Sequence, residues 1–135
     1  MKITSFNPLI VTKDVEAVAG LFEELGFEKR HNPGGTSAVG NEFKSYRMTD
    51  ANGFHVDVST STGASERDFT GIRMNVDDFD EAYDFLISRG FINGQNGTVT
   101  DTGSAKACIL LSPSGFGINL IQHIKNKTRL RLPQP

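Results

Sequence analysis

The chain has 135 residues, a formal net charge of −2, 37% hydrophobic and 22% charged residues. This length suits one compact domain, and the lack of a basic excess argues against a nucleic-acid partner, which would need phosphate-binding cations. The first residues contain no sustained apolar run, so we expect no signal peptide, no spanning helix and no membrane partner. The single cysteine, Cys108, cannot form an internal disulfide, which favours a cytoplasmic location.

The first predicted elements are a strand over residues 6–11 and a helix after it. Asp14 suits the N-cap of this helix, because its carboxylate can accept from free backbone amides, and Gly26 suits its end. Apolar residues at helical spacing predict the stripe that faces the core: Val18, Leu21, Phe22 and Leu25. The connection "HNPGGTSAVGN" is too rich in glycine for its strand to be placed. A hairpin of strands 43–49 and 54–59 follows, joined by the turn "DANG".

The second half of the chain repeats this order of elements. A strand over residues 71–76 leads into a helix with Asp78 as its N-cap and Gly90 at its end. Its predicted core stripe is Phe79, Ala82, Phe85 and Leu86. A second hairpin, with strands over residues 105–111 and 116–122, has the turn "SPSG". The sequence therefore predicts an α+β fold of two β-α-β-β-β units.

We expect a single domain over residues 1–125, with units at about 1–63 and 64–125. The remaining residues, 126–135, belong to a basic tail. A tail rich in charge and proline is typical of a solvated chain end. The alternative is that it contacts an acidic patch of a second subunit.

Alternation along the strands separates a core face from a polar face. The core face is predicted to hold Phe54, Val56, Val58, Ile72, Met74, Val76, Ile118 and Leu120. The opposite face carries Asn7, Leu9, His55, Asp57, Ser59, Gly71, Arg73, Asn75, Asn119, Ile121 and His123. If the hairpins close as four-residue turns, Tyr46 lies opposite Asp57 and Cys108 opposite Asn119, on this same face. Such a face either meets water or lines a pocket.

The paired units, the helices that close in "LGF" and "RGF", and the turn before each last strand resemble the vicinal oxygen chelate superfamily. This superfamily includes glyoxalase I, extradiol dioxygenases, fosfomycin resistance proteins and bleomycin resistance proteins. The resemblance covers about residues 1–125. It implies a cup-shaped mixed sheet with helices on its outer face, around one ligand site, and a homodimer.

The resemblance also locates the positions that hold metal ligands in metal-dependent members. They fall on Asn7 and Gly71 in the first strand of each unit, and on Asp57 and Asn119 in the last. A divalent metal of this class needs about three imidazole or carboxylate donors, and only Asp57 is a good one. We therefore predict no metal and no cofactor. A displaced His55/Asp57 pair is the alternative.

The predicted ligand-binding residues are Asn7, Leu9, Tyr46, His55, Asp57, Arg73, Asn75, Cys108 and Asn119. Arg73 either pairs with Asp57 or forks onto an anionic ligand group. Cys108 is expected to be a buried filler, since no cation is placed to lower its pKa. No nucleophile, base and orienting group are arranged together, so no catalytic residue is predicted.

Three functions are consistent with this sequence. The first is a metal-free protein that binds a small organic ligand, resembling the bleomycin resistance branch, and sequesters an antibiotic or metabolite. The second is a glyoxalase-like lyase or isomerase in which His55 or Asp57 acts as general base. The third is a structural or regulatory dimer with a vestigial cup.

Overall fold

The computed structural model describes residues 1–31, 44–61 and 67–124, which hold two helices and nine strands. The α+β class is confirmed. These residues divide into two compact units. The first unit is residues 7–71, and the second is residues 1–6 together with the chain from residue 72. Within the described part, no helix is both long and apolar enough to span a membrane. The basic tail and most of the "HNPGGTSAVGN" connection lie outside the described residues.

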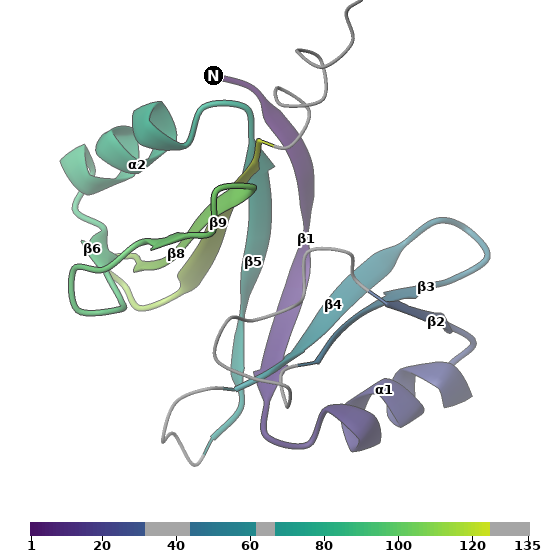
Figure 1. Ribbon diagram of the computed structural model, residues 1–135. Coiled ribbons are helices and arrows are strands. Elements are labelled where there is room, and N and C mark those ends of the chain that lie inside the picture. Colours follow the sequence, from purple (N-terminus) through teal and green to yellow (C-terminus); the bar gives the residue numbers. More distant parts are fainter. Residues whose placement is uncertain (32–43, 62–66, 125–135) are drawn as a thin grey trace, which may run out of the picture. The chain divides into compact units, whose positions relative to one another are not determined.

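The first unit is a four-stranded mixed sheet with one helix. It contains residues 7–12 of β1 (Ile3–Thr12), α1 (Val15–Glu24), β2 (Glu28–His31), β3 (Ser45–Thr49) and β4 (His55–Thr60), in the strand order β2-β3-β4-β1. β1 runs parallel to β4, and the other pairs are antiparallel. Figure 1 shows α1 beside β2, β3 and β4. The core between helix and sheet is built from Val15, Ala19, Tyr46, Met48, Val56 and Val58.

The second unit repeats this plan with short additional strands. It contains most of β5 (Phe69–Val76), then α2 (Phe79–Ser88), β6 (Ile92–Asn93), β7 (Thr100–Asp101), β8 (Ala105–Leu111) and β9 (Gly117–His123). The order is β5-β9-β8-β6, with β7 also paired to β8. The core under α2 is built from Met74, Val76, Phe79, Ala82, Leu86, Cys108, Leu110, Ile118 and Leu120.

The start of the chain belongs to the second unit because its backbone is tied there. The amide of Lys2 donates to Asp77 Oδ1 (2.6 Å), and the amide of Asp77 donates to the carbonyl of Lys2 (3.1 Å). The units therefore divide inside β1 and β5. The single domain over residues 1–125 stays a prediction.

Both helices begin and end as the sequence predicts. Asp14 Oδ1 accepts from the amide of Ala17, and Asp78 Oδ1 accepts from the amide of Glu81, each at 3.1 Å. Gly26 and Gly90 follow the helices with positive φ of 106° and 96°. The two carboxylates satisfy free backbone amides in the first turn of each helix. The left-handed glycines let the chain turn away from the helix axis after the last turn.

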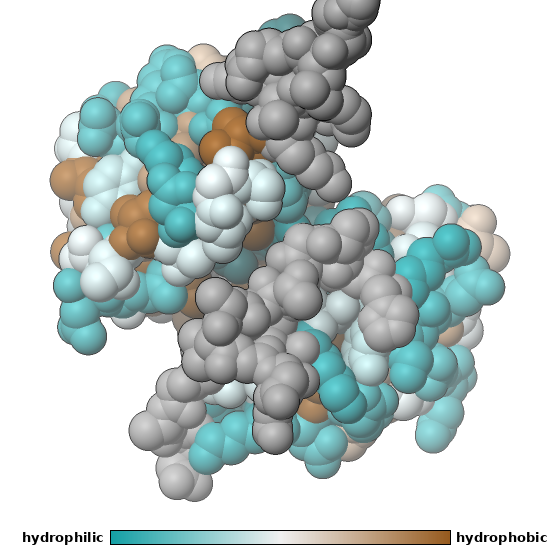
Figure 2. Space-filling model, in the orientation of Figure 1, coloured by the Kyte–Doolittle hydropathy of each residue, from teal (hydrophilic) through white to brown (hydrophobic). Residues whose placement is uncertain are grey.

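The buried stripes of the helices differ from the predicted ones. In α1 the stripe starts earlier and consists of Val15, Val18, Ala19 and Phe22, while Leu21 and Leu25 are exposed. In α2, Phe85 is exposed. Phe54, which is predicted on the core face of the strand over residues 54–59, is also exposed, because it precedes β4 and lies at the end of the hairpin turn. Figure 2 shows hydrophobic atoms of the unit that holds α2 as separate patches among hydrophilic residues on the face in view. Scattered apolar residues are common on protein surfaces and indicate nothing further.

The hairpin turns explain a register that the sequence reading missed. In the first hairpin the amide of Asp50 donates to the carbonyl of Phe54 (2.9 Å), and the amide of Gly53 donates to the carbonyl of Asp50 (3.0 Å). Gly53 has φ +88°. The loop is therefore a three-residue turn that ends in a left-handed glycine, with one residue more than a two-residue hairpin loop.

The second hairpin has the same loop. Ser112 and Phe116 replace Asp50 and Phe54, and Gly115 has φ +108°. A shift of one residue in the register changes which side chains lie opposite each other. It also changes which side chains of one strand share a face with those of the other. The predicted four-residue closure is wrong for both hairpins.

We expect Gly53→Ala to destabilise the protein by about 1–2 kcal/mol, because a Cβ is unfavourable in the left-handed region. A Cβ built at Gly53 meets no atom within 4 Å, so the loss would come from the backbone alone. Gly20→Ala in α1, also free of close contacts, is the matched control and should stabilise by roughly 0.5–1 kcal/mol. Urea unfolding measures both, and a neutral Gly53→Ala would contradict the turn assignment.

Candidate functional site

A fully buried carboxylate, Asp57 of β4, lies at the centre of the polar face of the first unit. Arg47 stands opposite it on β3. The guanidinium donates twice, from Nε to Asp57 Oδ1 (3.0 Å) and from Nη2 to Oδ2 (3.1 Å). Asn7 Nδ2 donates to Oδ2 as well (3.1 Å). A bidentate ion pair of this kind compensates the buried charge of the carboxylate and has a well-defined geometry.

The amide of Asn7 is fixed in orientation by two acceptors. Its Nδ2 lies 2.9 Å from the carbonyl oxygen of Pro8 and 3.1 Å from Asp57 Oδ2, and neither oxygen can donate. The Nδ2 group must therefore face both of them. Asn7 is only 3% exposed, and its Oδ1 is buried with no hydrogen-bond partner in the described structure. The site thus holds a buried acceptor atom that the protein leaves unused.

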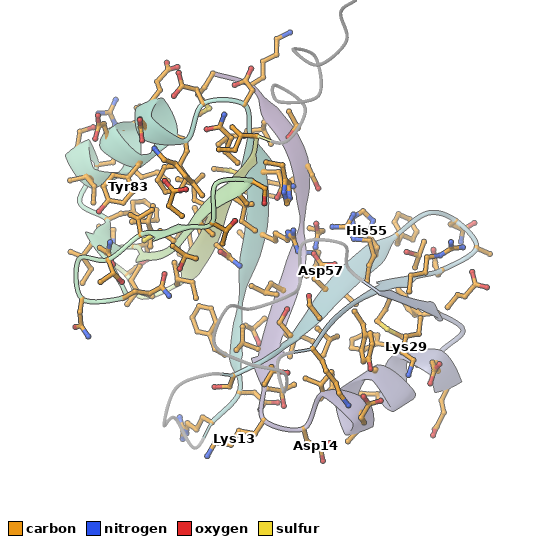
Figure 3. All side chains as sticks on the ribbon, viewed as in Figure 1. Lys13, Asp14, Lys29, His55, Asp57 and Tyr83 are labelled. Carbon is orange, nitrogen blue, oxygen red and sulfur yellow. The ribbon has the colours of Figure 1, made fainter. Side chains whose placement is uncertain are left out.

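His55 supplies a second unused atom. It lies two residues before Asp57 on β4, so both side chains share one face. Figure 3 shows the two labelled side chains on the side of β4 away from α1. The ring Nδ1 lies 3.4 Å from the carbonyl oxygen of Gly53, and in the tautomer that makes this hydrogen bond the proton is on Nδ1. Nε2 is then the acceptor of the neutral ring, and it is buried with no partner among the described residues.

One apolar residue and a pair of hydroxyls complete this face. Leu9 is paired in register with Asp57 and is buried. Further along the hairpin, the hydroxyls of Ser45 and Ser59 lie 2.9 Å apart. We use the name polar face for the side of the sheet formed by Asn7, Leu9, Ser45, Arg47, His55, Asp57 and Ser59.

The structure brings four of the predicted site residues together in the first unit: Asn7, Leu9, His55 and Asp57. Arg73, Asn75 and Asn119 belong to the second unit. There Arg73 is buried on β5, and its Nε lies 3.4 Å from Asn75 Oδ1. Asn119 pairs with Ile109 across the β8–β9 hairpin. The ligand-binding roles of these residues stay predictions.

Two site residues do not lie where the sequence reading put them. Tyr46 pairs with Val58 rather than with Asp57, and Cys108 pairs with Leu120 rather than with Asn119. Both side chains lie in the hydrophobic cores, because the three-residue loops shift each register by one. Burial raises the pKa of the Cys108 thiol, in keeping with a core residue.

Arg47 is the residue of the candidate site that sequence reasoning missed. The signal was available in the glycine at the fourth position of "DANG", which favours a left-handed residue and hence the three-residue loop. With that loop, Asp57 falls opposite Arg47.

The donor set does not fit the metal that the superfamily resemblance implies. Asp57 already accepts from a guanidinium and an amide, Asn7 donates to that carboxylate, and Gly71 has no side chain. Among the described residues, no three His, Cys, Asp or Glu side chains come close enough together to hold a metal ion.

No family model matches this sequence, and no curated protein sequence matches it. Solved structures do match. A glyoxalase/bleomycin resistance protein/dioxygenase superfamily member from Vibrio splendidus 12B01 is 14% identical, with 90% of this chain and 99% of that chain covered and a TM-score of 0.56. The chain has the vicinal oxygen chelate fold.

Two further structures with this fold widen the comparison. Glyoxalase I from Zea mays has a TM-score of 0.64 at 14% identity, and 90% of this chain covers 43% of the maize chain. A methylmalonyl-CoA epimerase has a TM-score of 0.54 at 17% identity, and the match covers 87% of this chain and 92% of the epimerase chain. At these identities the likeness establishes the fold and leaves the activity open.

On the other side of the sheet, Glu16 anchors α1 to β3. Its Oε2 accepts from the hydroxyl of Tyr46 (2.8 Å) and from Lys44 Nζ (3.0 Å), and Lys29 Nζ lies 3.5 Å from its Oε1. These contacts, the Tyr46 hydroxyl first, lower the pKa of Glu16 from 4.5 to about 2. The hydrogen bond to Glu16 in turn raises the pKa of Tyr46.

We expect removal of the Arg47 guanidinium to cost far more than removal of an exposed one. Breaking a fully buried ion pair costs about 3–5 kcal/mol. Because the Arg47 side chain is 32% exposed, we expect about 2–4 kcal/mol for Arg47→Met. The control is Arg30→Met, whose pair with Glu28 on β2 is exposed at 64% and 71% and should cost less than about 1 kcal/mol. Equal losses in urea unfolding would contradict a structural role for the Arg47–Asp57 pair.

We expect Glu16 to contribute to acid stability. Since its folded-state pKa is lowered, the contribution is present above pH 4.5 and is lost as the pH falls from 4.5 to about 2. Glu16→Gln should therefore show a shallower fall of unfolding free energy over this range and converge with the wild type near pH 2. Glu24→Gln, at an exposed position of the same helix, is the control. Parallel curves for Glu16→Gln and the wild type would contradict the assignment.

Proposed function

We propose that this protein binds a small organic molecule on the polar face of the first unit, without a metal ion of the superfamily's usual kind. The observation that carries the proposal is a carboxylate already paired with Arg47, on a face with two buried polar atoms that have no hydrogen-bond partner among the described residues. Buried polar atoms are almost always hydrogen-bonded, to the protein, to an ordered water or to a bound group, so these two atoms call for a partner from outside the described residues. The unused atoms of Asn7 and His55 are therefore natural contacts for a ligand.

Preorganisation supports binding on this face. The Arg47 side chain is held by two hydrogen bonds to Asp57, and Asn7 is held by two more of its own. Side chains fixed before a ligand arrives lose little conformational freedom on binding. A few placed polar groups beside apolar surface, here the buried Leu9, are typical of small-molecule sites.

Sequestration of an antibiotic or metabolite is the form of binding that we favour, as in the bleomycin resistance branch that the sequence resembles. The superfamily name printed for the Vibrio structure includes that branch. A dimer and a cytoplasmic location remain part of this proposal.

Lyase or isomerase chemistry is the second candidate, and His55 is the residue that supports it. Its Nε2 carries a lone pair that no described residue uses, as a general base requires. Asp57 is less suited to that role, because three of its roughly four acceptor positions are already occupied. The structures with this fold include enzymes, namely glyoxalase I and methylmalonyl-CoA epimerase.

A fragment screen on the full chain tests the proposal. We expect some small polar aromatic compounds to raise the melting temperature, because a ligand that binds only the folded state stabilises it. The same compounds should shift the NMR signals of Asn7, Leu9 and His55. Compounds that bind elsewhere, or a screen without any binder, would contradict the site.

Elemental analysis of the purified protein addresses the metal. We expect less than a stoichiometric amount of nickel, zinc, iron or manganese, and we expect fragment binding to survive treatment with a chelator. A stoichiometric metal that is needed for fragment binding would overturn the metal-free part of the proposal.

A further inference from the structure

The unused atoms of the polar face share one chemical character. Asn7 Oδ1 is a carbonyl oxygen, and its identity is fixed because Nδ2 must face Pro8 O and Asp57 Oδ2. His55 Nε2 is the nitrogen without a proton in the neutral tautomer whose Nδ1 donates to the carbonyl of Gly53. Both atoms are buried, and in this tautomer both are acceptors.

The two acceptors belong to neighbouring strands. β1 and β4 run parallel, with Leu9 opposite Asp57, so Asn7 and His55 each stand two residues earlier on the same face. The bond from Asn7 to Asp57 ties the two strands together at this point. Because neighbouring strands lie about 4.8 Å apart, the two side chains are close enough for one small molecule to contact both.

The two unused atoms themselves disfavour an anion at this position. Asp57 contributes a negative charge that is paired with Arg47, and both unused atoms carry partial negative charge. A ligand carboxylate or phosphate at Asn7 Oδ1 or His55 Nε2 would place acceptor atoms against these acceptors. A molecule with N–H or O–H groups would instead satisfy two buried atoms whose desolvation is otherwise uncompensated.

We propose that Asn7 and His55 form an acceptor subsite, which selects an organic ligand through its amide, amine or hydroxyl hydrogens. This inference rests on the proposed binding function and adds the class of ligand group that the site takes. The selectivity comes from the free energy that is lost when an analogue without the N–H or O–H hydrogen leaves a buried acceptor unpaired.

Matched pairs of probes test the inference. Benzamide is compared with N,N-dimethylbenzamide, and phenol with anisole. Each compound is titrated into the full-length protein, which is ¹⁵N-labelled in the backbone and in the histidine rings, and binding is followed by NMR. We expect the hydrogen-bearing member of a pair to bind at least about tenfold more tightly and to move the Nε2 signal of His55. The methylated member should leave that signal in place.

Two histidine variants separate a specific subsite from a general preference for polar compounds. His55→Phe keeps an aromatic ring and removes the acceptor, so the preference within each pair should fall to about threefold or less. His123→Phe, at an exposed position on β9 of the second unit, is the matched control and should keep the full preference. Thermal unfolding of both variants confirms that they are folded.

The outcomes also distinguish this inference from the binding proposal. If both members of each pair bind the polar face equally, the acceptor subsite is wrong while ligand binding stands. The same conclusion follows if the two variants lose the preference alike. If no member of any pair and no other fragment binds the polar face, then only water hydrogen-bonds to Asn7 Oδ1 and His55 Nε2, and both proposals fail.

Discussion

The buried charge of Asp57 is the constraint on which the first unit is organised. A carboxylate without solvent contact is costly unless it is paired and hydrogen-bonded. Arg47 supplies the charge, Asn7 supplies a further donor, and the two come from strands on opposite sides of β4. The pair therefore ties β1, β4 and β3 together on the face opposite α1. Any change in the register of these strands would separate the charges.

That register is fixed by a single turn. The carboxylate of Asp50 accepts from the amides of Asn52 and Phe54, and Gly53 takes the left-handed conformation that closes the loop. The resulting odd number of loop residues puts Arg47 opposite Asp57 and directs Tyr46 into the core beneath α1. Site and core are thus set by one choice of loop, because side chains alternate between faces along a strand.

The sequence was sufficient to predict the helices and the main strands. It was not sufficient to predict the register of the hairpins or which residues of each helix face the sheet. The duplication, the caps at Asp14 and Asp78 and the α+β class depend on local signals, such as capping side chains and glycine stops, that act within a few residues. The partner of Asp57 depends on loop length across two strands, where an error of one residue exchanges Arg47 for Tyr46. The helix stripe was misplaced by one turn for a related reason: apolar residues fill two overlapping stripes of α1, and only packing against β3 and β4 selects the one with Val15 and Ala19.

The two units use the same turn for different chemistry. Ser112 Oγ accepts from three amides of its turn, as the carboxylate of Asp50 accepts from two, and both loops end in a left-handed glycine. In the second unit the residue that corresponds to Asp57 is Asn119, and it faces Ile109 rather than an arginine. Across this hairpin an uncharged residue therefore faces an uncharged residue, whereas in the first hairpin a carboxylate faces a guanidinium. The shared turn fixes which two positions meet, and the side chains at those positions decide whether they form an ion pair.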